Sequence, residues 1–250
     1  METMTLFDIP FTVCSLDDGI GRIEELIRAG RPQHIILANA HTLNLACDMP
    51  GYRNILKEAS LVLRDGTGVA WAMKKKGVNP LHNFVGTDFI PDFCRCAAKK
   101  GYRIFLLGAE PGVSEKAARR LESIAPGIEI CGQHHGFFTI EETDSIIEII
   151  NKARPDMLLV AMGNPRQELW ITENIDKLKV TVCIGVGALF DYLSGRVKRA
   201  PCWMLKAGME WIFRFVIEPK RLWKRYIIGN PIFVFRVYRE NKYAYKESSE

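Results

Sequence analysis

The sequence lacks both a long apolar run and an amino-terminal targeting segment. Its richest apolar stretch, residues 227–235, is interrupted by Gly229, Asn230 and Pro231, and no stretch reaches the roughly 18 uninterrupted apolar residues that a membrane-spanning helix needs. The first residues, METMTLFDIPF, contain no basic region followed by an apolar core. We therefore expect neither a membrane-spanning helix nor a secretory signal.

Disulfide and metal-binding patterns are also missing. The 7 cysteines are odd in number, scattered and without CxxC spacing, which is typical of reduced thiols in a cytosolic protein. No spacing matches a zinc or calcium site, and the adjacent His134 and His135 cannot both face one metal from a strand. The composition, 48% hydrophobic and 25% charged over 250 residues, excludes collagen-like chains, acidic disordered chains and disulfide miniproteins.

Positive charge is concentrated near the carboxyl terminus. Residues 196–239 contain 11 Lys and Arg against the two acids Glu210 and Glu218, a net +9 in a chain whose total is +5. The same segment holds nine aromatic residues, among them three of the Trp. A basic and aromatic segment without a spanning helix is typical of a surface that meets an anionic interface, or of a solvated helix face whose aromatics pack on the main domain. Nucleic acid is a third candidate partner.

Up to about residue 195, short β-branched runs alternate with helical patterns. Each run is continuously apolar, as expected for a strand that is covered on both faces. We therefore predict an α/β fold, a Rossmann-like parallel sheet with helices on both faces. The expected strands are His34–Ala38, Leu61–Leu63, Arg103–Leu107, Ile128–Cys131, Met157–Ala161 and Val180–Ile184.

After Gly195 the pattern is helical only. Helices are expected at about 201–215, 218–228 and 231–241, each opened by a proline, because proline is tolerated in a first helical turn. We predict two parts, an α/β core over residues 1–195 and a basic, aromatic helical appendage over residues 196–250.

In parallel sheets, ligands bind outside the carboxyl ends of the strands. Asp65 follows one expected strand and precedes Gly66, so it is either a turn and helix-cap residue or a carboxylate able to take a proton from a substrate hydroxyl. The loop 108–112 suits a phosphate through its backbone N–H groups and the helix that follows.

A dinucleotide fingerprint is incomplete. Gly185-Val186-Gly187 resembles its start, but the last glycine is missing and the motif comes late in the chain. A nicotinamide-dependent oxidoreductase is therefore an alternative with little support, as is a nucleic-acid-binding module that uses the basic segment.

Seven blocks in order resemble the WecG/TagA/CpsF glycosyltransferase family over nearly the whole chain. One block alone is a weak signal, but the full series, ending in an E-P-x-R-L-x-x-R-Y motif, is specific. The blocks are ANAHTLNLA (38–46), ASLVLRDGTGVAWAMKKKG (59–77), VGTDF (85–89), IFLLGAEPGV (104–113), PDMLLVAMGNPRQELWI (155–171), VGALFDYLSGRVKRAP (186–201) and MEWIFRFVIEPKRLWKRYIIGNPIF (209–233).

The resemblance implies an inverting, metal-independent enzyme that moves a sugar, N-acetylmannosamine in its best-known members, from a UDP-sugar to a polyprenyl-diphosphate-linked N-acetylglucosamine. Such enzymes serve cell-surface polysaccharide or teichoic acid synthesis. The resemblance further implies a cytoplasmic enzyme associated peripherally with the inner face of the cell membrane, without a cofactor and without nucleic acid as a partner, and it leaves a homo-oligomer open. The chain has no Asp-x-Asp motif, so basic side chains and helix N-termini would stabilise the leaving diphosphate.

The resemblance also implies roles for particular residues. Asp65 matches the candidate catalytic base, and Asn39 and Gln167 match polar positions that would hold acceptor and donor groups. The nucleotide is expected at Gly108, Phe137, Gly187 and Asp191, with Phe137 offering a face to the uracil. Arg214, Arg221, Lys224 and Arg225 are expected to bind diphosphates, because Arg pairs with phosphate oxygens in a bidentate manner.

The chain departs from the family pattern at two positions. Leu37 stands where a Thr is usual, and Asn83 stands where an Arg is usual. Both positions are expected near the substrates, and relatives that use UDP-glucose or other UDP-sugars exist. The identities of the donor and acceptor sugars therefore stay open at the level of the sequence.

Overall fold

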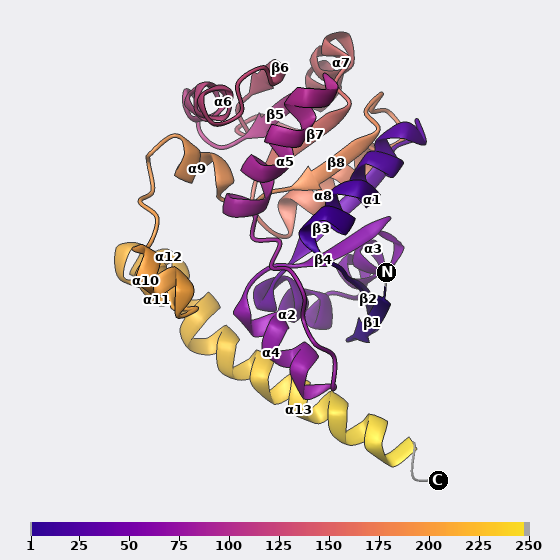
Figure 1. Ribbon diagram of the computed structural model, residues 1–250, viewed down its shortest axis with the longest axis vertical. Coiled ribbons are helices and arrows are strands. Elements are labelled where there is room, and N and C mark those ends of the chain that lie inside the picture. The colour runs from indigo at the N-terminus through magenta and orange to yellow at the C-terminus, as the bar shows by residue number, and fades with distance from the viewer. Residues whose placement is uncertain (1, 248–250) are drawn as a thin grey trace.

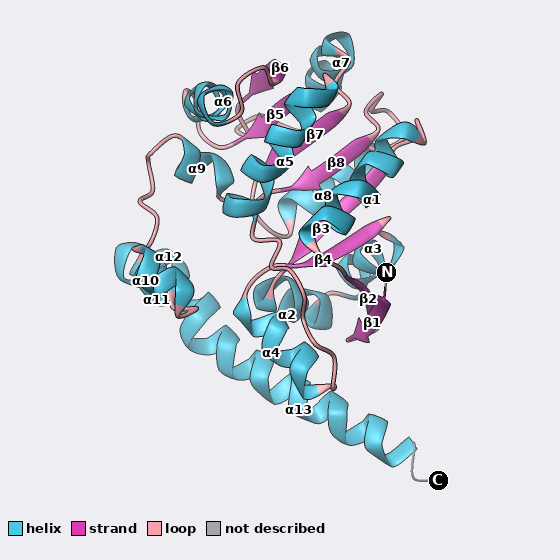
Figure 2. Cartoon of the chain, viewed as in Figure 1, coloured by secondary structure: helices cyan, strands magenta, loops and turns pink. Residues whose placement is uncertain are grey.

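A parallel sheet of six strands forms the centre of the molecule (Figures 1 and 2). The computed structural model describes residues 2–247, and the side chains of residues 2–240. All six expected strands form, with bounds that differ by at most three residues, so the predicted fold class is confirmed. The strands, in the order β4-β3-β8-β7-β5-β6, are β4 (Leu61–Arg64), β3 (Gln33–Ala38), β8 (Val182–Gly185), β7 (Met157–Ala161), β5 (Arg103–Gly108) and β6 (Glu129–His134).

Successive strand residues bury their side chains on opposite faces of this sheet. In β3, Ile35 and Leu37 join one core and Ile36 and Ala38 join another, which is why the run is apolar throughout. The first face is covered by α1 (Leu16–Arg28), α5 (Gly86–Lys100), α6 (Val113–Ile124) and α9 (Leu189–Leu193). The second is covered by α2 (Ala40–Asp48), α3 (Pro50–Glu58), α7 (Thr143–Ala153) and α8 (Arg166–Asn174), while α4 (Thr67–Lys75) joins the same core beside β4.

An antiparallel hairpin at the amino terminus was not predicted from the sequence. Strands β1 (Glu2–Leu6) and β2 (Ile9–Val13) are joined by Phe7 and Asp8, both at positive φ, 53° and 64°. Asn-Gly or Asp-Gly is the usual sequence for such a turn, and Phe-Asp is not a turn signal. The hairpin buries Leu6, Ile9 and Phe11 in the second core.

The segment after α9 is helical, but two of its expected boundaries are wrong. Gly208, at φ +70°, divides the expected helix 201–215 into α10 (Cys202–Lys206) and α11 (Glu210–Ile217), because a left-handed residue ends a helix. Pro219 opens α12 (Pro219–Trp223) as predicted. Pro231 does not open a new helix, since it lies in the first turn of α13 (Gly229–Glu247), where its missing N–H costs little.

A single π-helical turn, η1 (Lys224–Ile228), joins α12 to α13, so the chain is continuously helical from α12 to α13 with no intervening loop (Figure 1). None of the helices in the described part of the chain is both long enough and apolar enough to cross a bilayer. Residues 248–250 of the expected appendage lie outside the described residues.

Helix α13 is anchored on the second core. Phe233 is 2% exposed and Val237 is fully buried, among side chains of the hairpin, α2 and α4. The Phe7 amide donates to the Glu240 carboxylate at 2.8 Å, and Lys76 pairs with the same carboxylate at 2.8 Å. The last helix therefore contributes to the folded core as well as to the surface.

We expect Phe233→Ala to lower the free energy of unfolding by about 3–5 kcal/mol, because it leaves a cavity in this core. Phe235→Ala is the matched control. That side chain is 66% exposed, and its removal should change the free energy by less than about 0.5 kcal/mol. Urea denaturation of both variants measures the difference, and equal effects would show that α13 is not part of the core.

Candidate active site

A cleft of about 1120 Å³ opens at the carboxyl ends of the sheet strands. Its floor consists of the loops that follow the strands, and the helices from α10 to α13 form its opposite wall. Ten of the eleven site residues expected from the sequence line this cleft. They are Asn39, Asp65, Phe137, Gln167, Gly187, Asp191, Arg214, Arg221, Lys224 and Arg225.

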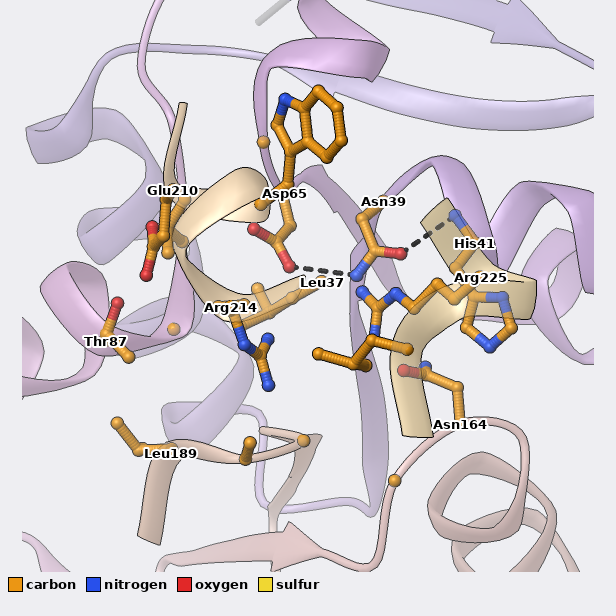
Figure 3. A pocket seen from close by; sticks show the side chains of 18 of the residues that line it. Leu37, Asn39, His41, Asp65, Thr87, Asn164, Leu189, Glu210, Arg214 and Arg225 are labelled. Carbon is orange, nitrogen blue, oxygen red and sulfur yellow. Dashed lines mark hydrogen bonds between the residues drawn. The ribbon is translucent and has the colours of Figure 1, made fainter. Parts of the chain in front are cut away.

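Asn39 and Asp65 meet at the ends of two neighbouring strands (Figure 3). Asn39 caps α2, and its Oδ1 accepts from the amides of His41 at 3.0 Å and Thr42 at 3.2 Å. With the oxygen so engaged, the Nδ2 group donates to Asp65 Oδ2 at 3.1 Å. Asp65 itself caps no helix, since the N-cap of α4 is Gly66. The cap of one helix thus orients the amide that holds the carboxylate.

Opposing effects set the protonation of Asp65. Burial raises the pKa of this carboxyl above its ordinary value, while the Asn39 hydrogen bond and the charges of Arg225, Arg214 and Arg64 lower it. Burial dominates, so the pKa is raised overall. A desolvated carboxylate held by one amide and facing guanidinium groups suits a general base that must take a proton from a hydroxyl.

The helical wall brings positive charge to the cleft. Arg214 lies over the ring of Tyr192 at 5.4 Å, and Figure 3 shows Arg214 and Arg225 pointing toward the space beside Asp65. Arg221 is exposed and pairs with Glu218 at 2.9 Å, and Lys224 is also exposed. Arg214 and Arg225 are therefore the cations of this wall whose charges act on Asp65, whereas Arg221 and Lys224 are exposed to solvent.

The other end of the cleft lies at the loops after β5, β6 and β8. The Phe137 ring is 62% exposed, and half-buried Asp191 lies 3.9 Å from Arg196. Burial raises the pKa of Asp191, and the Arg196 charge opposes this shift. Gly108 does not line the cleft: at φ 139° it packs on Ala161, where a Cβ would come within 2.4 Å of the carbonyl oxygen.

Gln167 joins two loops of the floor. Its side chain is 2% exposed, and its Oε1 accepts from the amides of Gly163 at 3.2 Å and Gly187 at 3.0 Å. Its Nε2 donates to Glu168 at 2.7 Å. Gln167 therefore connects the loop after β7 to the loop after β8. Its second Nε2 hydrogen is not used in these hydrogen bonds.

Glu168 was not predicted from the sequence as a site residue. It is 1% exposed, and burial raises its pKa to about 7. An acid in the first turn of a helix is common for reasons of helix electrostatics alone, so the sequence contains no signal for it. Glu168 itself does not line the cleft, whereas Glu210 and His41 line it without having been predicted. Burial, together with the charge of Arg225, lowers the pKa of His41 to about 4.

The two departures from the family pattern both line the cleft. Asn83 Oδ1 accepts from the Gly66 amide at 2.7 Å and from Arg64 Nη1 at 3.1 Å, and so holds the loop that follows Asp65. Leu37 presents an apolar side chain to the same space (Figure 3). Among the described residues, no three His, Cys, Asp or Glu side chains gather as metal ligands would.

Comparison with known proteins gives a family and several relatives. The model of the family described as "Glycosyl transferase WecG/TagA/CpsF family" matches residues 4–247. An N-acetylglucosaminyldiphosphoundecaprenol N-acetyl-beta-D-mannosaminyltransferase of Bacillus subtilis (strain 168) is 31% identical over 243 residues, which cover 97% of this chain and 93% of that protein. A protein of the same name from Staphylococcus aureus (strain NCTC 8325 / PS 47) is 32% identical over 203 residues, 81% of this chain and 78% of the relative.

We expect Asn39→Asp to shift the acidic limb of the kcat/KM profile to higher pH. The aspartate keeps the helix cap, but it removes the amide donor from Asp65 and adds a like charge, and both changes raise the pKa of Asp65 further. Activity should fall more at about pH 6 than at about pH 9, with an unchanged thermal unfolding midpoint. A uniform loss across the pH range would contradict this electrostatic coupling.

Proposed function

The chain belongs to the WecG/TagA/CpsF glycosyltransferase family, and on this premise we propose that it transfers N-acetylmannosamine from a UDP-sugar to a polyprenyl-diphosphate-linked N-acetylglucosamine. The observation that supports this most directly is the Asn39–Asp65 pair, placed opposite Arg214 and Arg225 in one cleft. The names of the two relatives supply the sugars and the lipid.

In the proposed reaction, Asp65 takes the proton of the acceptor hydroxyl. The hydroxyl oxygen attacks the anomeric carbon of the donor sugar, the bond from that carbon to the diphosphate oxygen breaks, and UDP leaves with the electron pair. A single displacement of this kind inverts the anomeric centre. Arg214 and Arg225 face the region where the negative charge of the diphosphate develops, and fixed cations there lower the barrier.

The cleft offers two ends for the two substrates. The loops after β5, β6 and β8 bring exposed Phe137 and the backbone of Gly187 to one end, suited to the uridine. The strand ends of β3 and β4 bring Asn39 and Asp65 to the other end, suited to the acceptor hydroxyl. We therefore propose that the donor sugar lies between the two.

A lipid-linked acceptor also requires contact with a membrane. Helices α10 to α13 and the turn η1 expose large apolar side chains in a segment rich in Lys and Arg, and we define this apolar surface by Trp203, Val216, Ile217, Trp223, Ile227, Ile228 and Phe235. Apolar side chains mixed with cations match the interface of an anionic bilayer. We propose that this apolar surface docks on the membrane that holds the acceptor.

The function is tested by UDP release from a panel of UDP-sugars, with and without a short-chain polyprenyl-diphosphate-linked N-acetylglucosamine. We expect acceptor-dependent release with UDP-N-acetylmannosamine, and we expect Asp65→Asn to lower kcat about 10²–10⁴-fold with UDP affinity unchanged. Release with UDP-glucose alone would replace the proposed donor. Turnover by Asp65→Asn at a near-native rate would remove Asp65 as the base.

The membrane contact is tested by co-sedimentation with vesicles rich in phosphatidylglycerol. The double variant Val216→Glu/Ile227→Glu should bind at least about tenfold more weakly, because each change places a charge on a surface that would enter the interface. Asp65→Asn, whose change lies inside the cleft, serves as the control and should bind like the wild type. Unchanged binding of the double variant, or concentration-dependent self-association in place of vesicle binding, would contradict the proposal.

A further inference from the structure

Glu168 lies beneath the floor of the cleft and does not line it, yet two residues that do line it are bound to its carboxylate. Oε1 accepts from Asn164 Nδ2 at 2.8 Å and from Gln167 Nε2 at 2.7 Å, and Oε2 accepts from the Tyr52 hydroxyl at 3.1 Å. No ion pair joins this carboxylate to any Lys or Arg whose side chain is described. Burying a carboxyl group that is held by neutral donors alone is costly, so the geometry that this group imposes on its neighbours is of interest.

The carboxylate fixes which way the Asn164 amide faces. Oε1 already accepts from Gln167 Nε2, so it is an acceptor for Asn164 as well, and Asn164 must turn its NH₂ group toward it. The same nitrogen also points at the Tyr52 hydroxyl, at 3.5 Å. Asn164 lines the cleft, and Figure 3 shows its side chain below Arg225 and His41, with the amide oxygen toward the interior of the cleft. Glu168 therefore leaves Asn164 Oδ1 as an acceptor that faces the substrates.

The position of Asn164 along the sheet edge indicates which substrate this acceptor meets. Asn164 follows β7, and the strand order places β7 between β5 and β6 on one side and β8, β3 and β4 on the other. The expected nucleotide end has Phe137 after β6 on the first side and Gly187 after β8 next to β7 on the second side, whereas Asp65 follows β4 at the far end of the second side. The group that must bridge these ends is the sugar of the donor.

We propose that Glu168 is a positioning residue for donor recognition: it holds the Asn164 amide so that Oδ1 accepts a hydrogen bond from a hydroxyl or acylamino N–H of the donor sugar. This inference rests on the proposed function, because it takes a UDP-sugar as the ligand. It assigns Asn164 as a specificity-determining contact and Gln167 as the residue that ties Glu168 to the loop after β8.

Glu168→Gln is the informative substitution, because it keeps the size of the side chain and replaces one oxygen with an NH₂ group. An amide at this position can no longer accept from Asn164, Gln167 and Tyr52 together. The Asn164 amide would turn over to restore pairing, and its NH₂ group would then face the donor sugar. Asn164→Ala removes the contact directly and keeps the inference testable if Glu168→Gln fails to fold.

The test is calorimetric titration of the full chain with UDP-N-acetylmannosamine and, separately, with UDP. We expect Glu168→Gln and Asn164→Ala each to weaken binding of the UDP-sugar about 5–20-fold, the cost of one lost or mismatched hydrogen bond, and to change UDP affinity by less than about twofold. The double variant should bind the UDP-sugar no more weakly than Asn164→Ala, because both changes remove the same contact.

Glu24→Gln is the matched control. Glu24 is also nearly buried, but it lies on α1 and pairs with Lys100 at 2.6 Å, away from the cleft, so this variant should bind both ligands like the wild type. Equal weakening of UDP and UDP-sugar binding by Glu168→Gln, or additive losses in the double variant, would overturn the inference and leave Glu168 a structural residue. If the wild type binds UDP-N-acetylmannosamine no more tightly than UDP, the role of Glu168 in donor recognition is overturned, while the proposed function stands. A wild type that binds neither ligand would overturn the proposed function and the inference with it.

Discussion

The organisation of the cleft depends on the two sets of hydrogen bonds that the side-chain amide of Asn39 makes. Asn39 uses its oxygen to cap α2, so its nitrogen is available only to Asp65. The geometry of a helix start, which a local sequence dictates, thereby fixes the position of a carboxylate on the neighbouring strand. A similar division recurs after β7, an inner strand of the sheet, where the Gln167 oxygen accepts from two backbone amides and its nitrogen donates to Glu168. In both places an amide whose oxygen is occupied orients an acid.

Charge in the cleft is supplied from a distant part of the chain. The sheet contributes acids and amides, while Arg214 and Arg225 come from the helices after α9. The charges of these guanidinium groups lower the pKa of Asp65 while its burial raises it, so the helices affect the protonation of Asp65. Helix α13 can hold this wall in place because Phe233 and Val237 are buried in the same core as the hairpin. One segment thus contributes to the folded core, to the wall of the cleft and to the exposed apolar surface.

The sequence predicts the sheet well because each strand is covered on both faces and therefore reads as a continuous apolar run. It also places Asp65 correctly at a strand end. The hairpin was missed because its turn, Phe7-Asp8, contains no glycine or asparagine, and the break at Gly208 was missed because an isolated glycine is often tolerated within a helix. Glu168 could not be identified either, since its burial comes from α3, which contributes Tyr52 from more than a hundred residues earlier in the chain. Local patterns reveal elements and strand ends, whereas a role that arises from packing between distant elements needs the folded structure.

The proposed mechanism rests on one geometric arrangement, in which Asp65 deprotonates the acceptor hydroxyl while the nucleotide occupies the loops after β5, β6 and β8. A crystal structure with UDP and a soluble analogue of the lipid-linked acceptor tests it most directly. We expect the reacting hydroxyl within hydrogen-bond reach of an Asp65 carboxylate oxygen, about 2.6–3.2 Å, with the diphosphate facing Arg214 and Arg225. An acceptor hydroxyl bound away from Asp65, next to a different acid such as Glu210, would contradict it.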